Sequence, residues 1–538
     1  MAGVPRTFNM ADVWEMAADA VPEREALVVG DARRTYGQLE ERANRLAHHL
    51  VSQGIGAGDH VALYLENCPE YLEAMLAAWK LRAVTINVNH RYVADELRYL
   101  LDNSDSVAVL TQPSLAPTVA AVVGQVPAVR FTLVTGGDYD VAMAAAPADR
   151  PVVEGRCDDD QYIIYTGGTT GLPKGVVWRH VDAFFACIGG GDPMRMNGPV
   201  ERPEELPSRI AEQQICYLPL APMMHAAAQW TSLSWLFSGS KVVLMPGSLD
   251  PDAVWRTIGA EKVNSMTVVG DAVARPLLDA WDRAAAAGRP YDISSLFSIS
   301  NGGAPMATST RERIFATFPQ MLVTDGFGSS EAGAQGAMRV AAGDRPSGAS
   351  LVRFDQPTKP TIVVDLEGRE VVPGSGVAGQ VLAGGHLPLG YYNDPDKTAA
   401  TFVERDGERW LVTGDMATVG ADGAIELLGR GSVSINTGGE KVYPEEVEGV
   451  LKAHPSVYDC LVVGVPDEQW GSAVTAVVQP VPGTIPTLDE LAAHCKATLA
   501  GYKAPKRLVL TDAVVRSPSG KADYRWARET AEKADQTV

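Results

Sequence analysis

The sequence predicts an α/β protein. Its large N-terminal domain should contain parallel-rich sheets covered by helices plus a small β-barrel, and a small, mobile α+β domain should follow. Up to about residue 350, short apolar runs alternate with amphipathic helical patterns, as in parallel sheets covered by helices. Beyond Leu351, short strands are separated by Glu-Gly and Asp-Gly turns that predict hairpins. A chain of 538 residues is too long for one ordinary core, so two or more domains are expected.

The N-terminal part of the chain alternates helices and strands. In one stretch Leu39, Ala43, Leu46 and Leu50 fall on a single helical face, and similar patterns recur. We expect helices at Tyr36–Gln53, Tyr71–Leu81, Ala94–Leu101, Ala228–Phe237 and Pro251–Glu261. Apolar runs predict strands at His60–Leu65, Ala83–Asn87, Ser106–Leu110, Tyr162–Tyr165, Ile215–Leu218, Lys241–Met245, Ser265–Val269 and Leu296–Ser300.

The rest of the chain divides into a barrel and a separate domain. An antiparallel barrel is expected over about 341–430, with strands at Thr361–Asp365, Gly379–Ala383, Glu408–Val412 and Ala424–Leu428. We place the boundary after Arg430, which gives domains of 1–430 and 431–538. A helix is expected at Pro444–Ala453, because a proline opens it, two glutamates follow at the positive end of its dipole, and His454-Pro455 ends it.

Composition narrows the class of function. A net charge of −20 and a pI near 4.9 argue against binding to nucleic acid or to an anionic membrane, which needs clustered cations. The N-terminus lacks the apolar core of a signal peptide, and the tract near Ala116–Val129 is too short and too interrupted by proline to span a membrane. The six cysteines show no C-x-x-C pairing, which excludes an obvious zinc site and predicts a cytoplasmic protein.

The stretch Tyr165–Gly175 reads Y-T-G-G-T-T-G-L-P-K-G and concentrates groups that bind polyphosphate. Backbone N–H groups are offered by Gly167, Gly168 and Gly171. Hydroxyl donors come from Thr166, Thr169 and Thr170, and Lys174 carries a positive charge. The stretch is not a P-loop, because Lys174 follows Pro173 and Gly175 stands where a metal-binding Ser or Thr would be. Any Mg²⁺ must therefore be held from elsewhere. The alternative, a plain flexible surface loop, is disfavoured by the density of these residues directly after a strand.

This loop resembles the phosphate loop of the adenylate-forming superfamily, which comprises acyl-CoA synthetases, adenylation domains of peptide synthetases and luciferases. Further motifs follow in the order that the superfamily requires. They are Asn301-Gly302-Gly303-Ala304-Pro305, Asp325-Gly326-Phe327-Gly328-Ser329-Ser330-Glu331, Thr413-Gly414-Asp415, Arg430, the stretch Gly438–Glu448 and Ser517-Pro518-Ser519-Gly520-Lys521. The resemblance therefore covers most of the chain.

The resemblance implies which residues bind the nucleotide. Phe327 would stack on adenine, and Glu331 would reach Mg²⁺, for which a carboxylate is the expected ligand. Asp415 would accept hydrogen bonds from the ribose hydroxyls. Ser330 replaces the usual threonine, and Phe327 replaces the usual tyrosine. The expected ATP-binding set is Thr166, Gly167, Gly168, Thr169, Thr170, Gly171, Lys174, Gly303, Ala304, Pro305, Asp325, Gly326, Phe327, Gly328, Ser329, Ser330, Asp415, Arg430 and Lys521.

The resemblance also implies the catalytic and acyl-transfer groups. Lys521 would steady the carboxylate and the phosphate charge, and the catalytic set is Lys521, Glu331, His225 and Thr166. The acyl pocket would include His225, Ala226 and Ala227, although a core histidine remains an alternative for His225. The loop facing the thiol would be Gly438, Gly439, Glu440 and Lys441. The hinge position, usually Asp or Lys, is Ser432 here, with Gly431 as the alternative.

The implied activity is acid–thiol ligation. A carboxylate attacks the α-phosphorus of Mg·ATP, pyrophosphate leaves, and CoA then displaces AMP to form a thioester. Free CoA is favoured because we expect no carrier domain after Lys521, and a separate carrier protein is the alternative acceptor. The product AMP would distinguish this enzyme from an unrelated ATPase, and the presence of Lys521 and Glu331 argues against an inactive relative.

The stretches Trp178-Arg179-His180 and Gly270–Pro276 are most similar to actinobacterial-type fatty-acyl and steroid side-chain CoA synthetases. That similarity favours a medium-chain, long-chain or bulky acid over an aromatic or short-chain acid. The expected partners are this acid, ATP and CoA, without nucleic acid or a membrane segment. A homodimer is left open.

Overall fold

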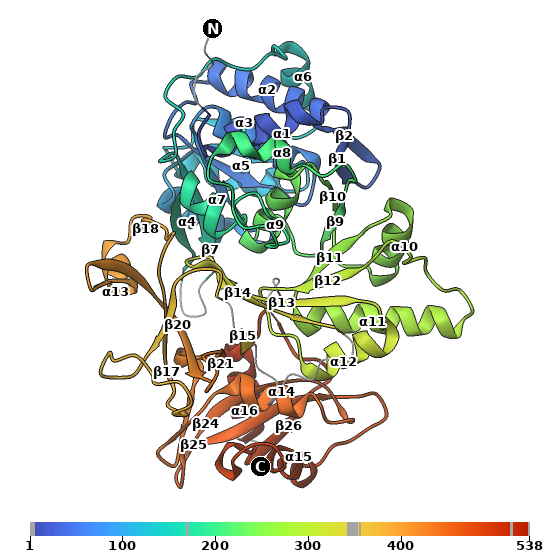
Figure 1. Cartoon of the computed structure of the whole chain (residues 1–538), viewed down its shortest axis with the longest axis vertical. Helices are drawn as coiled ribbons and strands as arrows, with labels where there is room; N and C mark the ends of the chain where they lie inside the picture. The colour runs from blue at the N-terminus through green and yellow to red at the C-terminus, as the bar shows by residue number, and fades with distance from the viewer. Residues whose placement is uncertain (1–5, 168–171, 342–352, 355–356, 517–519, 536–538) are drawn as a thin grey trace.

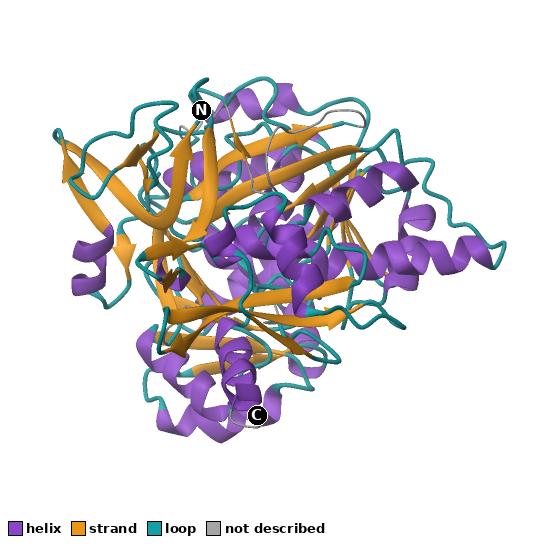
Figure 2. Cartoon of the chain, turned by 90° about the horizontal axis from the view of Figure 1, so that it is seen from below, coloured by secondary structure: helices purple, strands orange, loops and turns teal. Residues whose placement is uncertain are grey.

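The structure is a computed structural model that describes residues 6–167, 172–341, 353–354, 357–516 and 520–535. Figure 1 shows the N-terminal sheets at one end of the molecule and the C-terminal domain at the other. Figure 2 shows layers of strands with helices packed between and around them. The predicted α/β class, with a large N-terminal and a smaller C-terminal domain, is confirmed. The predicted site residues Gly168–Gly171, the segment 517–519 and most of the start of the predicted barrel lie outside the described residues.

The first layer is a seven-stranded sheet in the order β18-β8-β7-β4-β3-β5-β6. The strands from β6 to β7 are parallel, whereas β8 and β18 are added antiparallel. Its strands are β3 (His60–Tyr64), β4 (Val84–Asn87), β5 (Ser106–Thr111), β6 (Phe131–Val134), β7 (Gln161–Thr166), β8 (Lys174–Arg179) and β18 (Gly390–Tyr391). The predicted strands in this region therefore form, within one or two residues of their expected ends.

Helices of the N-terminal region pack between this sheet and the next. Helix α3 (Pro69–Lys80) contacts β3 of the first sheet and β1 of the second, so it lies between them. Helix α2 (Tyr36–Ser52) packs against α3 and opens with a capping box between Thr35 and Gln38. The other helices of this region are α1 (Met10–Ala20), α4 (Ala94–Asn103), α5 (Ala116–Val122), α6 (Gly137–Ala145), α7 (His180–Ala186) and α8 (Leu206–Arg209), with 3-10 turns at Val123–Gln125 and Pro203–Glu205.

The second layer is an eight-stranded sheet in the order β14-β13-β12-β11-β9-β10-β1-β2. It is parallel except for β2 and β14 at its edges. Its strands are β1 (Glu25–Val29), β2 (Ala32–Thr35), β9 (Cys216–Pro219), β10 (Lys241–Leu244), β11 (Ser265–Val268), β12 (Ser298–Asn301), β13 (Leu322–Ser329) and β14 (Gly333–Val340). Its helices are α9 (Ala226–Phe237), α10 (Pro251–Glu261), α11 (Gly270–Ala286) and α12 (Thr308–Thr317).

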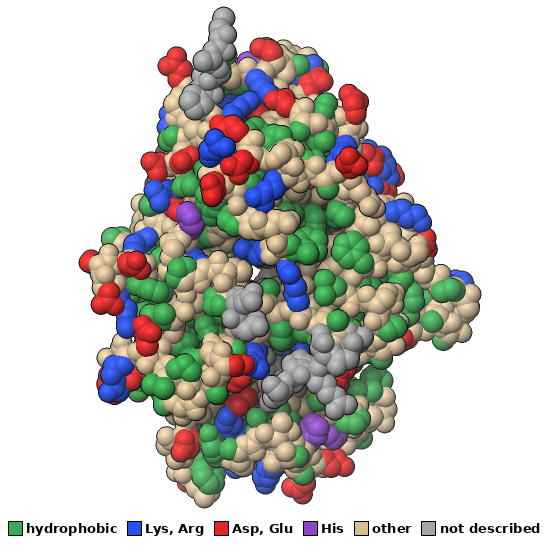
Figure 3. Space-filling view, in the orientation of Figure 1, with side chains coloured by type: hydrophobic (Ala, Val, Ile, Leu, Met, Phe, Trp, Pro, Cys, Tyr) green, Lys and Arg blue, Asp and Glu red, His purple; other side chains and the backbone are tan. Residues whose placement is uncertain are grey.

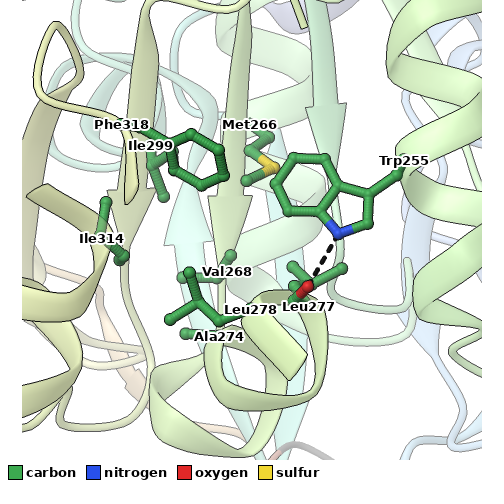
Figure 4. A pocket seen from close by; sticks show the side chains of 9 residues that line it. All are labelled: Trp255, Met266, Val268, Ala274, Leu277, Leu278, Ile299, Ile314 and Phe318. Atoms are coloured by element: carbon green, nitrogen blue, oxygen red, sulfur yellow. Dashed lines mark hydrogen bonds between the residues drawn. The ribbon is translucent and has the colours of Figure 1, made fainter. Parts of the chain in front are cut away.

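The helices α10, α11 and α12 close over β11 and β12 around a small apolar pocket (Figure 4). It is lined by Trp255, Met266, Val268, Ala274, Leu277, Leu278, Ile299, Ile314 and Phe318. The indole N–H of Trp255 donates to the carbonyl of Leu277 at 2.8 Å. The pocket encloses about 10 Å³, which is about the space of one water molecule. It is therefore part of the packed core and is too small for an acyl chain.

The third unit is antiparallel, as predicted, but its described residues form an open sheet rather than a closed barrel. The order is β15-β21-β20-β17-β16, and β19 pairs with β20 beside β21. One edge of β20 is divided between β19 and β21, so the strands branch instead of joining into a ring. The elements are β15 (Arg353–Phe354), β16 (Thr361–Val364), β17 (Gly379–Ala383), α13 (Pro395–Thr401), β19 (Phe402–Arg405), β20 (Glu408–Val419) and β21 (Ile425–Arg430).

Strand β20 is longer than the predicted Glu408–Val412. Its pairing with β17 slips between Gln380 and Leu382, so residues 413–415 form a β-bulge, in which Gly414 has a φ of +79°. A bulge re-aims the side chains next to it. The motif Thr413-Gly414-Asp415, which follows the predicted strand Glu408–Val412, lies inside the longer, bulged strand.

The C-terminal part has its own core and confirms the predicted α+β character. Strands β24, β25 and β26 form a three-stranded sheet, and β22 and β23 form a hairpin. The elements are η3 (Gly431–Val433), β22 (Ile435–Thr437), β23 (Glu440–Val442), α14 (Pro444–Leu451), β24 (Val457–Asp467), β25 (Gly471–Pro480), α15 (Leu488–Lys496), η4 (Gly501–Lys503), β26 (Arg507–Leu510) and α16 (Tyr524–Asp535). Helix α14 ends slightly before the predicted Ala453.

No helix in the described part of the chain combines the length and the apolar character needed to cross a membrane.

Candidate active site

The phosphate-loop motif begins at the end of β7 and ends in β8, and these two strands pair antiparallel. Thr166 at the end of β7 pairs with Lys174 at the start of β8. Gly167 is exposed, and Gly168, Thr169, Thr170 and Gly171 lie outside the described residues. A Cβ at Gly175 would lie 2.7 Å from the ring of Tyr165, so glycine is required there to bring the two strands together. The hairpin places Thr166 and Lys174 side by side.

Lys174 contacts a short element that the sequence analysis did not single out. Its ammonium pairs with the carboxylate of Asp394, which also caps helix α13 by accepting from the N–H of Lys397 at 3.0 Å. The same ammonium lies 5.8 Å from the centre of the Tyr391 ring. The charge of Lys174 lowers the pKa of Asp394. In this state Lys174 is therefore bound to Asp394.

Glu331 lies in the turn between β13 and β14, which is held on both sides. The indole N–H of Trp178 donates to the carbonyl of Ser330 at 3.0 Å. The ammonium of Lys359 donates to the carbonyl of Ala332 at 2.8 Å. The hydroxyl of Tyr391 donates to Oε1 of Glu331 at 3.0 Å. Glu331 is thus fixed by three side chains from separate segments.

The remaining predicted nucleotide residues line β12 and β13. The loop after β12 exposes Gly303, with a φ of +82°, and Pro305, and Asn301 donates to the carbonyl of Ala304 at 3.0 Å. Gly326, Gly328 and Ser329 continue β13. A Cβ at Gly328 would overlap the carbonyl of Gly333, so glycine is required for the hairpin.

Two side chains of β13 pack against protein groups. The ring of Phe327 stacks on Phe354, with a centroid distance of 5.6 Å and an interplanar angle of 23°. Asp325 is only 1% exposed, and its Oδ2 lies 2.6 Å from the guanidinium of Arg311. Burial raises the pKa of Asp325. Its carboxylate is therefore part of the interior and supports the strand.

Asp415 and Arg430 face each other on neighbouring strands. They are register partners on β20 and β21, and Nε of Arg430 lies 2.9 Å from Oδ1 of Asp415. The other oxygen, Oδ2, is buried and has no hydrogen-bond partner among the described residues. Burial raises the pKa of this carboxyl. An acceptor left unpaired in this way suits a ligand that carries hydroxyl donors.

Lys521 of the C-terminal domain lies among these groups. Burial and the charge of Arg430 lower the pKa of its ammonium, whereas Glu331 and Asp415 act in the opposite direction. The residue before it, Gly520, packs on the backbone and side chain of Val269, at the start of α11. The structure therefore brings Lys521, Glu331, Asp415 and Arg430 into one site.

His225 is close enough to Lys521 to be affected by its charge. Burial lowers the pKa of His225 to about 4, and the charges of Lys521, His90 and Arg91 add to this effect. Its Nε2 is buried without a hydrogen-bond partner among the described residues. The half-buried Ala226 and Ala227 follow at the start of α9. His225 therefore lies near Lys521, and its burial favours the neutral imidazole.

Asn87 is a further residue that the sequence analysis missed. It exchanges hydrogen bonds with the backbone of Tyr165, at 2.7 and 2.9 Å, and donates to the carbonyl of Met224 at 2.6 Å. It thereby ties the phosphate strand to the segment that carries His225. The sequence offered little signal for Asn87, Tyr391 or Lys359, because their contacts are made to residues distant in the chain.

A buried ion network joins the two domains next to the site. Nζ of Lys452, on the C-terminal domain, lies 3.3 Å from Oδ2 of Asp271 on α11 and 3.4 Å from Oδ1 of Asp459. Both partners of the first pair are buried, and the pairing raises the pKa of Lys452 against the effect of burial. Arg516, just before the segment that carries Lys521, also pairs with Asp459 at 2.6 Å. We call Asp271, Lys452, Asp459 and Arg516 the interdomain network.

A second interdomain contact lies beside the predicted hinge. Gly429 has a φ of +120°, and a Cβ there would overlap the carboxylate of Glu445 at the start of α14. Burial and the charge of Glu448 raise the pKa of Glu445 to about 8. The predicted hinge residue Ser432 is exposed in the short 3-10 turn η3, and Ser434 closes this turn with a hydrogen bond to the carbonyl of Gly431 at 2.8 Å.

The predicted thiol-facing loop is the turn of the β22–β23 hairpin. Gly438 and Gly439 have φ values of +59° and +88°, the left-handed region that a tight hairpin turn requires. Glu440 and Lys441 are exposed. The N–H of Gly438 donates to the carbonyl of Trp470 in the same domain at 2.9 Å.

Two family models match the chain. The model for the AMP-binding enzyme matches residues 14–392, and the model for the AMP-binding enzyme C-terminal domain matches residues 446–521. The chain belongs to the AMP-binding enzyme family. The second match ends at Lys521, so the C-terminal model includes the residue that the site geometry brings to Glu331 and Asp415.

Curated relatives of this AMP-binding enzyme span nearly its whole length. A protein of Mycolicibacterium smegmatis, named medium/long-chain-fatty-acid–CoA/3-oxocholest-4-en-26-oate–CoA ligase, is 46% identical, covering 98% of this chain and 97% of its own. A 3-oxocholest-4-en-26-oate–CoA ligase of Rhodococcus rhodochrous is 45% identical, covering 97% of this chain and 96% of its own. The anthranilate CoA ligase AuaEII, solved with anthranoyl-AMP, shares the fold with a TM-score of 0.85 at 23% identity, covering 99% of each chain.

The residues of this AMP-binding enzyme fit the nucleotide and metal that the resemblance implies. Within the described ranges no group of three or more His, Cys, Asp or Glu side chains could hold a metal ion alone. A single carboxylate such as Glu331 fits Mg²⁺, which takes most of its ligands from phosphates and water. Figure 3 shows a hollow near the middle of one face of the molecule with basic side chains at its rim. Positive charge at such an opening favours an anionic ligand.

Proposed function

We propose that the protein is an ATP-dependent acyl-CoA synthetase acting on a medium-chain or long-chain fatty acid or on a bulky steroid side-chain acid. The observation that carries this proposal is the convergence of Lys521 with Glu331, Asp415 and His225, because it joins the two domains around one site. The names of the relatives from Mycolicibacterium and Rhodococcus support the choice of acid and of CoA.

The first half-reaction forms an acyl-adenylate. A carboxylate oxygen of the acid attacks the α-phosphorus of ATP, and the bond from that phosphorus to the bridging oxygen of pyrophosphate breaks. Lys521 stabilises the charge that develops on the phosphorus oxygens, and Lys174 and Thr166 hold the β- and γ-phosphates. No side-chain nucleophile is needed, so the enzyme contributes positioning and charge.

Other residues hold the nucleotide and acid. Asp415 accepts from the ribose hydroxyls through the oxygen that Arg430 leaves unpaired, and Phe327 with the loop at Gly303 packs on adenine. Glu331 would hold Mg²⁺, which when bound neutralises phosphate charge. His225, neutral at physiological pH, borders the acyl pocket together with Ala226 and Ala227. The small alanines leave space for a broad acid.

The second half-reaction transfers the acyl group. The CoA thiol loses its proton to solvent, the sulfur attacks the carbonyl carbon, the bond from that carbon to the phosphate oxygen breaks, and AMP leaves. We propose that the domain 431–538 turns about Ser432 between the two steps, withdraws Lys521 and brings Gly438, Gly439, Glu440 and Lys441 to the thiol. In the present orientation these loop residues are exposed, as expected if they meet the thiol only after the domain has rotated.

The test is a product assay with a panel of acids. With octanoate, palmitate, benzoate and a steroid side-chain acid, each with CoA and Mg·ATP, we expect AMP, pyrophosphate and the acyl thioester in equal amounts. The rate of thioester formation with octanoate, palmitate or the steroid acid should exceed the rate with benzoate. Formation of ADP and phosphate would contradict the proposal. If the acyl-adenylate reacted with a pantetheinylated carrier protein but not with CoA, the acyl acceptor would be a carrier protein instead of CoA.

A further inference from the structure

Tyr391 bridges two groups that lie on different sheets. Its hydroxyl donates to Oε1 of Glu331 at 3.0 Å, and the ammonium of Lys174 lies 5.8 Å from the centre of its ring. Glu331 belongs to the β13–β14 turn of the eight-stranded sheet, and Lys174 begins β8 of the seven-stranded sheet. One side chain therefore contacts both the carboxylate assigned to the metal and the cation assigned to the phosphates.

The backbone of Tyr391 is held rigidly. It pairs with Val176 of β8, next to the phosphate hairpin, and its N–H donates to Oγ1 of Thr398 on α13 at 2.9 Å. A Cβ at the preceding Gly390 would lie 2.5 Å from the Thr398 methyl group, so only glycine allows α13 to come this close. The ring packs against a small apolar cluster that includes Ala332 and Phe402.

The hydroxyl of Tyr391 acts as a donor to Glu331, because a carboxylate offers only acceptors. A carboxylate has about four lone-pair positions, so one accepted hydrogen bond orients it without using up its capacity for a metal ion. Trp178 and Lys359 fix only the backbone on either side of Glu331, whereas Tyr391 contacts the carboxylate itself.

We propose that Tyr391 is a positioning residue, whose hydroxyl orients Glu331 toward the metal carried by ATP and whose ring holds Lys174 beside the phosphates. This inference rests on the proposed function. It predicts that two separate parts of nucleotide binding depend on two separate parts of one side chain.

The experiment measures the ATP affinity of the full chain by calorimetry, once in MgCl₂ and once in EDTA. Tyr391→Phe removes only the hydroxyl, and losing a hydrogen bond to a charged group costs about tenfold in affinity. The Mg²⁺ gain is the ratio of the ATP affinity in MgCl₂ to the ATP affinity in EDTA. We expect this gain to fall about tenfold in Tyr391→Phe, and the affinity in EDTA to stay within about twofold of wild type. Tyr391→Leu also removes the ring and should weaken binding in EDTA about two- to fivefold.

Tyr392→Phe is the matched control, because its hydroxyl donates instead to Asp105 at 2.8 Å. Both affinities should stay at the wild-type values in that variant. In a Glu331→Gln background, Tyr391→Phe should cause no further loss of the Mg²⁺ gain, since the hydroxyl acts on that gain only through the carboxylate that Gln lacks. Melting temperatures without nucleotide check that each variant is folded.

An unchanged Mg²⁺ gain in folded Tyr391→Phe, or additive losses in the double variant, would overturn the positioning role while leaving the proposed function standing. A wild-type protein without Mg²⁺-dependent ATP binding would overturn both.

Discussion

At the scale of single residues, the site combines side chains of the N-terminal domain with the ammonium of Lys521 from the C-terminal domain. Lys521 lies where Glu331 and Asp415 supply negative charge and where Arg430 is already paired with Asp415. The same lysine contributes to keeping His225 neutral. In the proposed reaction, a charge held on a separate domain would serve the first step and be absent from the second. It would thereby stabilise a transition state without holding the product in place.

Lys521→Ala should reduce acyl-adenylate formation by on the order of 10²-fold or more, because the charge is needed while the α-phosphorus is attacked. Thioester formation from supplied acyl-adenylate and CoA should persist, because that step does not use the lysine. Pyrophosphate release and thioester formation, measured separately, check this. Equal losses in both half-reactions would remove the role assigned to Lys521.

At the scale of secondary-structure elements, the β7–β8 hairpin that carries Thr166 and Lys174 contacts strand β18 and helix α13. Strand β18 extends the sheet beside β8, and helix α13 after it carries Asp394 at its start. Lys174 is bound to this carboxylate in the present state. Nucleotide phosphates must therefore compete with a side chain of the enzyme for the same ammonium.

Asp394→Asn should lower the apparent KM for ATP about two- to fivefold, since a partly exposed ion pair contributes at most about 1 kcal/mol. The amide oxygen can still accept from the N–H of Lys397, so the helix cap is kept. Steady-state rates at varied ATP measure the effect. Asp396→Asn, an exposed change in the same helix turn, serves as the control and should leave KM as it is. A raised KM in Asp394→Asn would show that the pair positions Lys174 rather than competing for it.

Elements with regular patterns could be predicted from the sequence. Helix α10 has the predicted bounds because Asp250 caps it and Pro251 opens it, and both are local signals. The expected barrel does not close among the described residues, because one edge of β20 is shared between β19 and β21, and such pairing depends on residues distant in the chain. Motif residues such as Glu331 and Lys521 could be proposed, whereas Tyr391 could not, because its role depends on Lys174 and Glu331 being brought to it by folding.

At the scale of the whole molecule, the interdomain network sets the orientation of the C-terminal domain. Lys452 and Asp271 are both buried and lie on opposite sides of the domain interface. Arg275 of α11 adds hydrogen bonds to the carbonyls of Lys452 and Tyr458. Arg516 connects this network to the segment that carries Lys521. The contacts that hold the domains together thus also hold the segment before the proposed catalytic lysine, Lys521.

Lys452→Met should reduce adenylation about tenfold or more while sparing acyl transfer from supplied acyl-adenylate. Removing one partner of a buried pair leaves Asp271 uncompensated, which costs about 3–5 kcal/mol in this orientation. Once the domain has turned away, water can solvate that carboxylate. Lys496→Met, at an exposed lysine of the same domain, is the control and should change neither half-reaction. Parallel losses in both half-reactions of Lys452→Met would indicate general destabilisation instead.

The burial of Glu445 against Gly429 means that domain rotation should move a proton. With a pKa of about 8 in this orientation, Glu445 is mostly protonated at pH 7. Once solvated, it returns to a pKa of about 4.3. Turning the domain should therefore release about one proton to solvent. The present orientation is favoured most below about pH 4.3 and loses that advantage as the pH rises to about 8. Acyl transfer itself also releases the thiol proton of CoA. When CoA is added to the acyl-adenylate complex, a pH-indicator dye in weak buffer should therefore report more protons than thioester formed. Glu445→Gln should remove this excess, and an excess unchanged in that variant would assign the proton to another group.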